Sequence, residues 1–175
     1  ATGLIKDEDD GDPNTTDNTQ DGDKPKISII ATDPVAIEGG GAGDPATDNA
    51  LVYTISQSNL SEMDSSVLVK LDPANSSIEP EDLASISYTD STGQVITLSS
   101  QAEITDFLTN GVTITIPAGQ TAAPAITITV VDDDIYENEE ALTLVISTPS
   151  NAYLDASSAT GLIKDEDDGD PNTTD

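Results

Sequence analysis

Residues 126–144 read ITITVVDDDIYENEEALTL, two patterned segments on either side of a short acidic loop. Ile126, Ile128 and Val130 alternate with threonines, and the alternation resumes at Leu142. Successive side chains of a strand point to opposite faces, so a period of two indicates a strand with one buried face. The stretch therefore predicts two antiparallel strands joined by an acidic loop, with bounds 126–130 and 142–146.

The same alternation recurs along the body of the chain, with turn signals such as Asp33-Pro34 and Thr92-Gly93 between the segments. Further strands are predicted over residues 27–32, 51–57, 67–71, 85–89, 94–98, 112–116 and 159–164. The predicted fold class is all-β, an immunoglobulin-like antiparallel β-sandwich of about seven to nine strands with Greek-key connections.

One segment breaks the strand pattern and predicts a helix. Ser100 and Glu103 have the spacing of a capping box, in which each side chain bonds the backbone of the other residue. The apolar residues that follow share one helical face, and Gly111 can end the helix. We expect one short helix over 101–109, inserted between strands.

Acidic residues dominate the charge of the chain, with 34 Asp and Glu against 5 Lys and Arg and a net charge of -29. This balance excludes nucleic acid and anionic membranes as partners and favours cations. The absence of cysteine and histidine removes disulfides, thiolate zinc sites and the commonest general base. We expect no membrane contact, no small-molecule substrate and no enzymatic activity. A halophile-type acidic coat that merely keeps the protein hydrated is the alternative.

The two ends of the sequence repeat each other. Residues 1–17 and 159–175 carry the same 17 letters, ATGLIKDEDDGDPNTTD, and the offset of 159 minus 1, or 158 residues, matches one whole domain per repeat. The expected organisation is an acidic linker over 1–23, the sandwich over 24–164 and a second acidic linker over 165–175. Neighbouring identical repeats in the same chain are the expected partners, and an isolated repeat is expected to be a monomer.

The acidic loop at 132–140 gathers six carboxylates between two strands. Two carboxylates about 4 Å apart repel by roughly 1 kcal/mol in water and by about 4 kcal/mol at an effective dielectric near 20. A converging cluster therefore needs a counterion. Ca²⁺ suits it, because this hard cation takes about six to eight oxygen ligands from carboxylates and carbonyls. The alternative is a set of solvated loop acids.

The run Asp-Asp-Asp-Ile-Tyr-Glu-Asn-Glu-Glu at 132–140 resembles the motif of the Calx-beta family. The turn Ile-Pro-Ala-Gly-Gln-Thr at 116–121 is similar to the family's turn before that strand. Glu38, in Ile-Glu-Gly, is similar to its early glutamate, and the acidic run after Ile163 is similar to its terminal aspartate cluster.

This resemblance implies calcium ligation by acidic side chains and one backbone carbonyl. The implied carboxylate ligands are Glu38, Asp132, Asp133, Glu137, Glu140, Asp165, Asp167 and Asp168, with the carbonyl of Ile135. Asp82, in Glu-Asp-Leu, is similar to a mid-domain aspartate of the family. The segment 85–111 departs from the compact Calx-beta pattern and looks more like the extender repeats of large RTX-type adhesins.

The expected function is that of an extender, or spacer, repeat of a bacterial cell-surface adhesin outside the cell. One weakly held ion stabilises its bound state by roughly 2.7 kcal/mol, whereas ordering eight linker residues costs about 8 to 16 kcal/mol. We therefore expect three or more Ca²⁺ per repeat at the junction, where they rigidify the array and project a distal ligand-binding region. The alternatives are a Calx-beta calcium-sensing regulatory domain and an acidic halophilic spacer without a specific metal.

Overall fold

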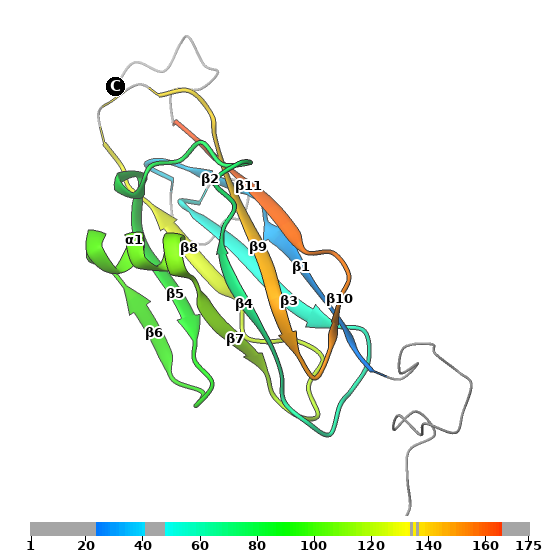
Figure 1. Cartoon of the computed structure of the whole chain (residues 1–175). Helices are drawn as coiled ribbons and strands as arrows, with labels where there is room; N and C mark the ends of the chain where they lie inside the picture. Colours follow the sequence, from blue (N-terminus) through cyan, green and yellow to red (C-terminus); the bar gives the residue numbers. More distant parts are fainter. Residues whose placement is uncertain (1–23, 41–47, 134, 136, 166–175) are drawn as a thin grey trace, which may run out of the picture.

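The computed structural model describes residues 24–40, 48–133, 135 and 137–165 as a β-sandwich with one α-helix (Figure 1). One sheet has the strand order β10 (Tyr153–Leu154), β1 (Lys26–Asp33), β3 (Ala50–Gln57), β8 (Ile126–Val130), β5 (Leu83–Thr89) and β6 (Val95–Leu98). The other has the order β2 (Val35–Ile37), β11 (Ser158–Lys164), β9 (Glu140–Ser150), β4 (Ser65–Leu71) and β7 (Val112–Ile116). The predicted fold class is confirmed.

All predicted strands are present, but the strand count is higher than predicted. The described residues hold eleven strands, because β2 and β10 were missed. These strands have only three and two residues, too few for an alternating pattern to emerge. Both pair in parallel, β2 with β11 and β10 with β1, so the sandwich is not purely antiparallel as predicted.

The chain changes sheets at Pro34, between β1 and β2. The pairing of β1 with β3 shifts register between Ala31 and Asp33, as a β-bulge does. Proline has no N–H to donate to a sheet, so the ladder ends there and the chain is free to cross. As a result, β1 pairs with β3 in one sheet and β2 pairs with β11 in the other.

The core lies between the sheets, and a tyrosine crosses it. Tyr53 on β3 is fully buried, and its hydroxyl donates a 2.6 Å hydrogen bond to the carbonyl of Leu142 on β9. Burial raises the pKa of the Tyr53 phenol. A Cβ added at Gly161 on β11 would lie 2.8 Å from Tyr53 Oη and from a methyl group of Leu51. Glycine at 161 therefore permits this close contact between the sheets.

The helix α1 (Gln101–Asn110) forms as predicted, one residue longer. The Ser100 hydroxyl accepts from the N–H of Glu103, whose carboxylate accepts from the N–H of Ser100. Gly111 ends the helix at φ +75°, a left-handed conformation that favours glycine. The helix buries Ile104, Phe107 and Leu108, and packs against β4 and the 3₁₀ turn η1 (Pro80–Asp82). In the described part of the chain, no helix is long and apolar enough to cross a membrane.

Candidate metal centre

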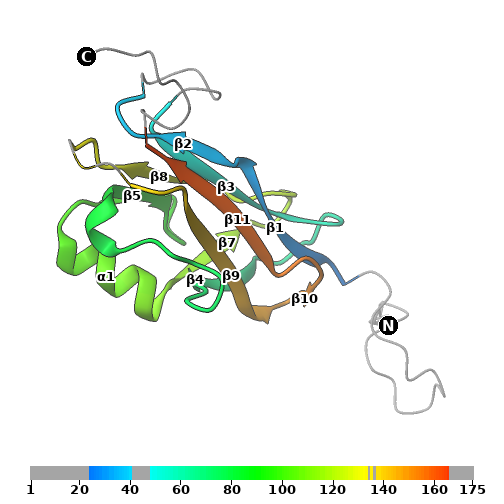
Figure 2. The same cartoon turned by 90° about the horizontal axis from the view of Figure 1, so that it is seen from above.

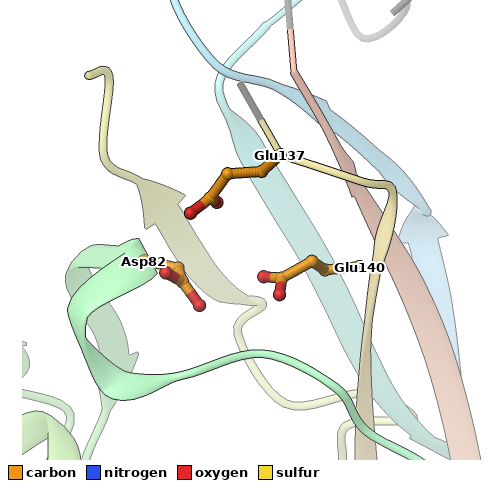
Figure 3. Close-up of side chains that lie close together, drawn as sticks. All are labelled: Asp82, Glu137 and Glu140. Atoms are coloured by element: carbon orange, nitrogen blue, oxygen red, sulfur yellow. The ribbon is translucent and has the colours of Figure 1, made fainter. Parts of the chain in front are cut away.

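Three carboxylates from separate segments converge at one end of the sandwich (Figure 3). Asp82 comes from η1, Glu137 from the loop between β8 and β9, and Glu140 is the first residue of β9. One carboxylate oxygen of each lies within 4.8 Å of those of the other two. All three are predicted ligands, and the structure brings them together.

Two serines guide the chain from β4 towards Asp82. After β4 ends, the chain continues beside the first residues of β9. The Ser76 hydroxyl accepts from the N–H of Thr143, and the Ser77 hydroxyl accepts from the N–H of Ala141, each at 2.9 Å. The Ser77 N–H donates in turn to the Ala141 carbonyl at 2.9 Å. These contacts satisfy backbone groups of the first residues of β9 and hold the segment beside them.

The turn η1 is fixed to the acidic loop through its backbone. The Val131 N–H, directly after β8, donates a 2.8 Å hydrogen bond to the carbonyl of Asp82. The Asp82 carboxylate also accepts from the N–H of Glu79. Asp82 is therefore held at both its backbone and its side chain.

Glu38 and Asp165 lie at the ends of the adjacent strands β2 and β11. They are 5% and 6% exposed, an unusual burial for carboxylates. The Glu38 N–H donates to the Lys164 carbonyl at 2.9 Å, and Oδ2 of Asp165 accepts from the Glu137 N–H at 2.9 Å. Asp165 thus ties the acidic loop to the end of the last strand.

The crowding of negative charge changes the acidity of the cluster. Burial, the charge of Asp82 and a hydrogen bond to Asp82 raise the pKa of Glu140 from 4.5 to about 8. Burial and the charges of Asp82 and Asp133 raise the pKa of Glu137. Oε2 of Glu140 is buried, with no hydrogen-bond partner among the described residues. The cluster thus holds one buried carboxylate oxygen that lacks a compensating donor among the described residues.

These residues fit a calcium ion. Ca²⁺–oxygen distances of about 2.3 to 2.6 Å place two ligands of one ion at most roughly 5 Å apart, which the converging oxygens satisfy. The buried oxygen of Glu140 has the missing partner that a cation supplies. The donors are oxygens, and the chain has neither cysteine nor histidine to favour a softer metal.

Two further predicted ligands, Asp132 and Asp133, do not belong to the converging group. Asp132 and Asp133 are exposed on the loop, and Oδ1 of Asp133 accepts from the Ile135 N–H at 2.7 Å. The Ile135 side chain is exposed as well. Asp133 lies near enough to Glu137 to raise its pKa. Ligation by these residues stays a prediction, and Asp167 and Asp168 lie outside the described residues.

Glu79 is a neighbouring carboxylate that the sequence analysis missed. Its charge contributes to the raised pKa of Glu137, although it is exposed. The sequence does place Glu79, Glu81 and Asp82 around Pro80. This pattern resembles an ordinary solvated turn, so it did not indicate a metal ligand. The contact with Val131 joins this turn to the chain just before the acidic loop.

Comparison with known proteins agrees with this architecture. A solved structure described as CBD12 from CALX1.2 matches with a TM-score of 0.52 at 14% identity, over 81% of this chain and 44% of that one. The chain therefore spans less than half the length of that protein. The apo-form Calx CBD1 domain matches with a TM-score of 0.47 at 17% identity, over 81% of this chain and 99% of that one. No curated protein matches the sequence.

The sequence model of the Calx-beta domain family matches residues 47–167, which is more than half of the chain and includes the three converging carboxylates. Glu38 lies before the matched region. Fold and family agree, and the chain belongs to the Calx-beta family of calcium-binding domains.

Proposed function

We propose that this domain is a structural extender repeat of a bacterial cell-surface adhesin, located outside the cell. Ca²⁺ bound where one repeat meets the next would stiffen the tandem array and hold a distal ligand-binding region away from the surface. The duplicated 17 residues carry the proposal, because the second copy begins within β11 and contains Asp165. Site and repeat boundary therefore coincide.

The proposed centre of the site is the group Asp82, Glu137 and Glu140, with Glu38 and Asp165 beside it. The remaining proposed ligands are Asp132, Asp133, the Ile135 carbonyl, Asp167 and Asp168, and we propose three or more ions per repeat. Bound Ca²⁺ supplies positive charge that offsets the repulsion among these carboxylates. Asp165 directly follows the last strand, so fixing its carboxylate restricts the direction in which the chain leaves the domain.

Small-angle X-ray scattering on a protein of two consecutive repeats tests the proposal. We expect a larger maximum dimension in millimolar Ca²⁺ than in chelator, because the junction stops bending. An unchanged maximum dimension would refute the stiffening role. The acidic-coat alternative instead predicts that NaCl at matched ionic strength replaces Ca²⁺, since exposed charges are screened over about 8 Å at physiological ionic strength.

Matched glutamate variants identify the responsible site. Glu137→Gln in the first repeat removes one charge from the converging group. Glu62→Gln removes one exposed charge from the loop between β3 and β4, at the opposite end of the domain. We expect the first substitution to reduce the calcium response and the second to leave it intact.

Family membership is also consistent with a second candidate, a calcium-sensing regulatory domain. Calcium affinity separates the two, because intracellular sensing requires a dissociation constant of about 10⁻⁷ to 10⁻⁵ M, whereas extracellular modules work at about 10⁻⁴ to 10⁻³ M. Calorimetric titration of the single domain gives this value. Micromolar affinity would support the sensor.

A further inference from the structure

The second and the last strands of the domain, β2 and β11, lie side by side. β2 pairs in parallel with β11, with Ile163 opposite Ala36 at the middle of the pairing. Two hydrogen bonds bracket it, from the Leu162 N–H to the Pro34 carbonyl at 2.8 Å and from the Glu38 N–H to the Lys164 carbonyl at 2.9 Å. Ala36 and Ile163 are buried, so the pair is also anchored in the core.

The chain enters the domain at one end of the sandwich and leaves it at the other. The start of β1 lies beside β10, whereas β2 and the end of β11 lie together at the far end (Figures 1 and 2). The entry point is well held, because the Pro25 carbonyl accepts from the Tyr153 N–H and the Lys26 carbonyl accepts from the Ser58 N–H. The Lys24 ammonium also lies 4.6 Å from the centre of the Tyr153 ring.

Tension along the chain loads β2 and β11 in shear. A pull at Lys24 acts along β1 towards one end of the domain, and a pull at Asp165 acts along β11 towards the other. Because β2 and β11 run in parallel, these forces slide one strand past the other. In shear, the interstrand hydrogen bonds resist together, whereas peeling breaks them one at a time. Sliding also moves Ile163 out of the core, at the cost of exposing apolar surface.

We propose that the β2–β11 pair is a mechanical clamp, which makes the domain a load-bearing link when its two ends are pulled apart. The clamp follows from the strand geometry and does not require a metal. Where the proposed calcium function holds, an ion shared by Glu38 and Asp165 would join the two strands at the end where β11 is pulled, because each residue directly follows its strand.

Single-molecule force spectroscopy in chelator tests the clamp through the direction of pulling. The chain has no cysteine, so an engineered cysteine defines an attachment point uniquely. One protein is pulled through its two chain ends, and the other through its N-terminal end and Ser150→Cys. Ser150 is exposed and precedes β10, on the same side as the start of β1, so the second geometry peels the parallel β1–β10 pair from one end.

The clamp predicts a severalfold higher unfolding force through the chain ends than through Ser150→Cys at the same loading rate. Equal forces, or a lower force through the chain ends, would overturn it. Both measurements use the same fold, so differences in equilibrium stability do not enter the comparison. Because the force measurement is made in chelator, its result does not depend on calcium binding. The scattering experiment does depend on calcium binding, so the two proposals can fail separately.

A pair of core variants locates the resistance. Ile163→Ala on β11 and Ile86→Ala on β5 each remove the same atoms from a buried site, but only the first lies in the clamp. We expect Ile163→Ala to lower the force through the chain ends clearly more than Ile86→Ala does. An equal loss for both would contradict the clamp. If Ile163→Ala does not fold, Ile163→Val and Ile86→Val provide the same comparison.

Discussion

The N–H of Glu137 donates a 2.9 Å hydrogen bond to Oδ2 of Asp165, which joins the acidic loop to the residue that ends the last strand. Glu137 belongs to the converging carboxylates, and Asp165 belongs to the duplicated segment. A change of charge or geometry in the loop therefore acts directly on the point where the chain leaves the domain. This contact connects the chemistry of the site with the proposed mechanical role.

Replacing Glu140 by glutamine separates metal binding from folding. The substitution keeps the shape of the side chain and removes a charge that burial and Asp82 disfavour. In chelator we expect an unchanged or slightly higher melting temperature. In calcium we expect a smaller rise than in the wild type, since losing one ion held at a hundred times its dissociation constant removes about 2.7 kcal/mol. Glu62→Gln should keep the full rise, and a full rise in Glu140→Gln would count against its role as a ligand.

The raised pKa of Glu140 gives the calcium-free domain a distinctive pH dependence. Its folded-state pKa of about 8 lies above the ordinary value of 4.5, so between these values the folded state binds more protons than the unfolded state. Stability in chelator should therefore fall as the pH rises through this window. Glu137, whose pKa is also raised, acts in the same direction.

Calcium should reverse this trend, because protons and Ca²⁺ compete for the same carboxylates. Thermal unfolding followed by circular dichroism at several pH values, with chelator and with calcium, gives both slopes. Parallel slopes in the two conditions would mean that calcium does not bind the groups whose pKa values are raised. Glu140→Gln should flatten the slope measured in chelator.

Adding a methyl group at Gly161 should destabilise the fold. Its Cβ would lie 2.8 Å from Tyr53 Oη and from a Leu51 methyl group, and overpacking of this kind costs about 1 to 3 kcal/mol. Denaturant unfolding of Gly161→Ala measures the loss. In a Tyr53→Phe background the cost should be smaller, because one of the clashing atoms is gone. An unchanged free energy of unfolding in Gly161→Ala would show that the neighbours move at no cost.

Removing the helix cap tests how far α1 supports the site. Ser100→Ala removes the hydroxyl that accepts from Glu103, and losses of this type cost about 0.5 to 2 kcal/mol. The control is Thr105→Ala, which changes an exposed side chain on the same helix and should have little effect. Because Asp82 is held by Val131 and Glu79, we expect both variants to keep their calcium affinity. A large loss of affinity in Ser100→Ala would make the helix part of the site.

Local pattern was enough to predict the nine longer strands and the helix. The alternation at Ile126, Ile128 and Val130 and the capping pair at Ser100 and Glu103 are local rules, and both gave the correct element. Neither rule says which strands become neighbours. The short β2 and β10 follow from the crossing at Pro34 and from pairing with longer strands, which are properties of the complete fold.

The metal centre was only partly accessible from the sequence. Charge density alone indicated the loop that holds Glu137 and Glu140, but Asp82 is far away along the chain and was found through the family resemblance. Its position depends on hydrogen bonds between the hydroxyls of Ser76 and Ser77 and the first residues of β9. No periodicity in the sequence reveals these bonds. The number of acidic residues in the loop does not distinguish Glu140, which is half-buried with a buried Oε2, from the exposed Asp132.

Isothermal titration calorimetry with Ca²⁺ on the single domain, beside Glu140→Gln and Glu62→Gln, tests the central claim most directly. The account predicts three or more bound ions in the wild type and in Glu62→Gln, with fewer or much weaker sites in Glu140→Gln. No calcium binding in the wild type, or identical binding in all three proteins, would contradict it.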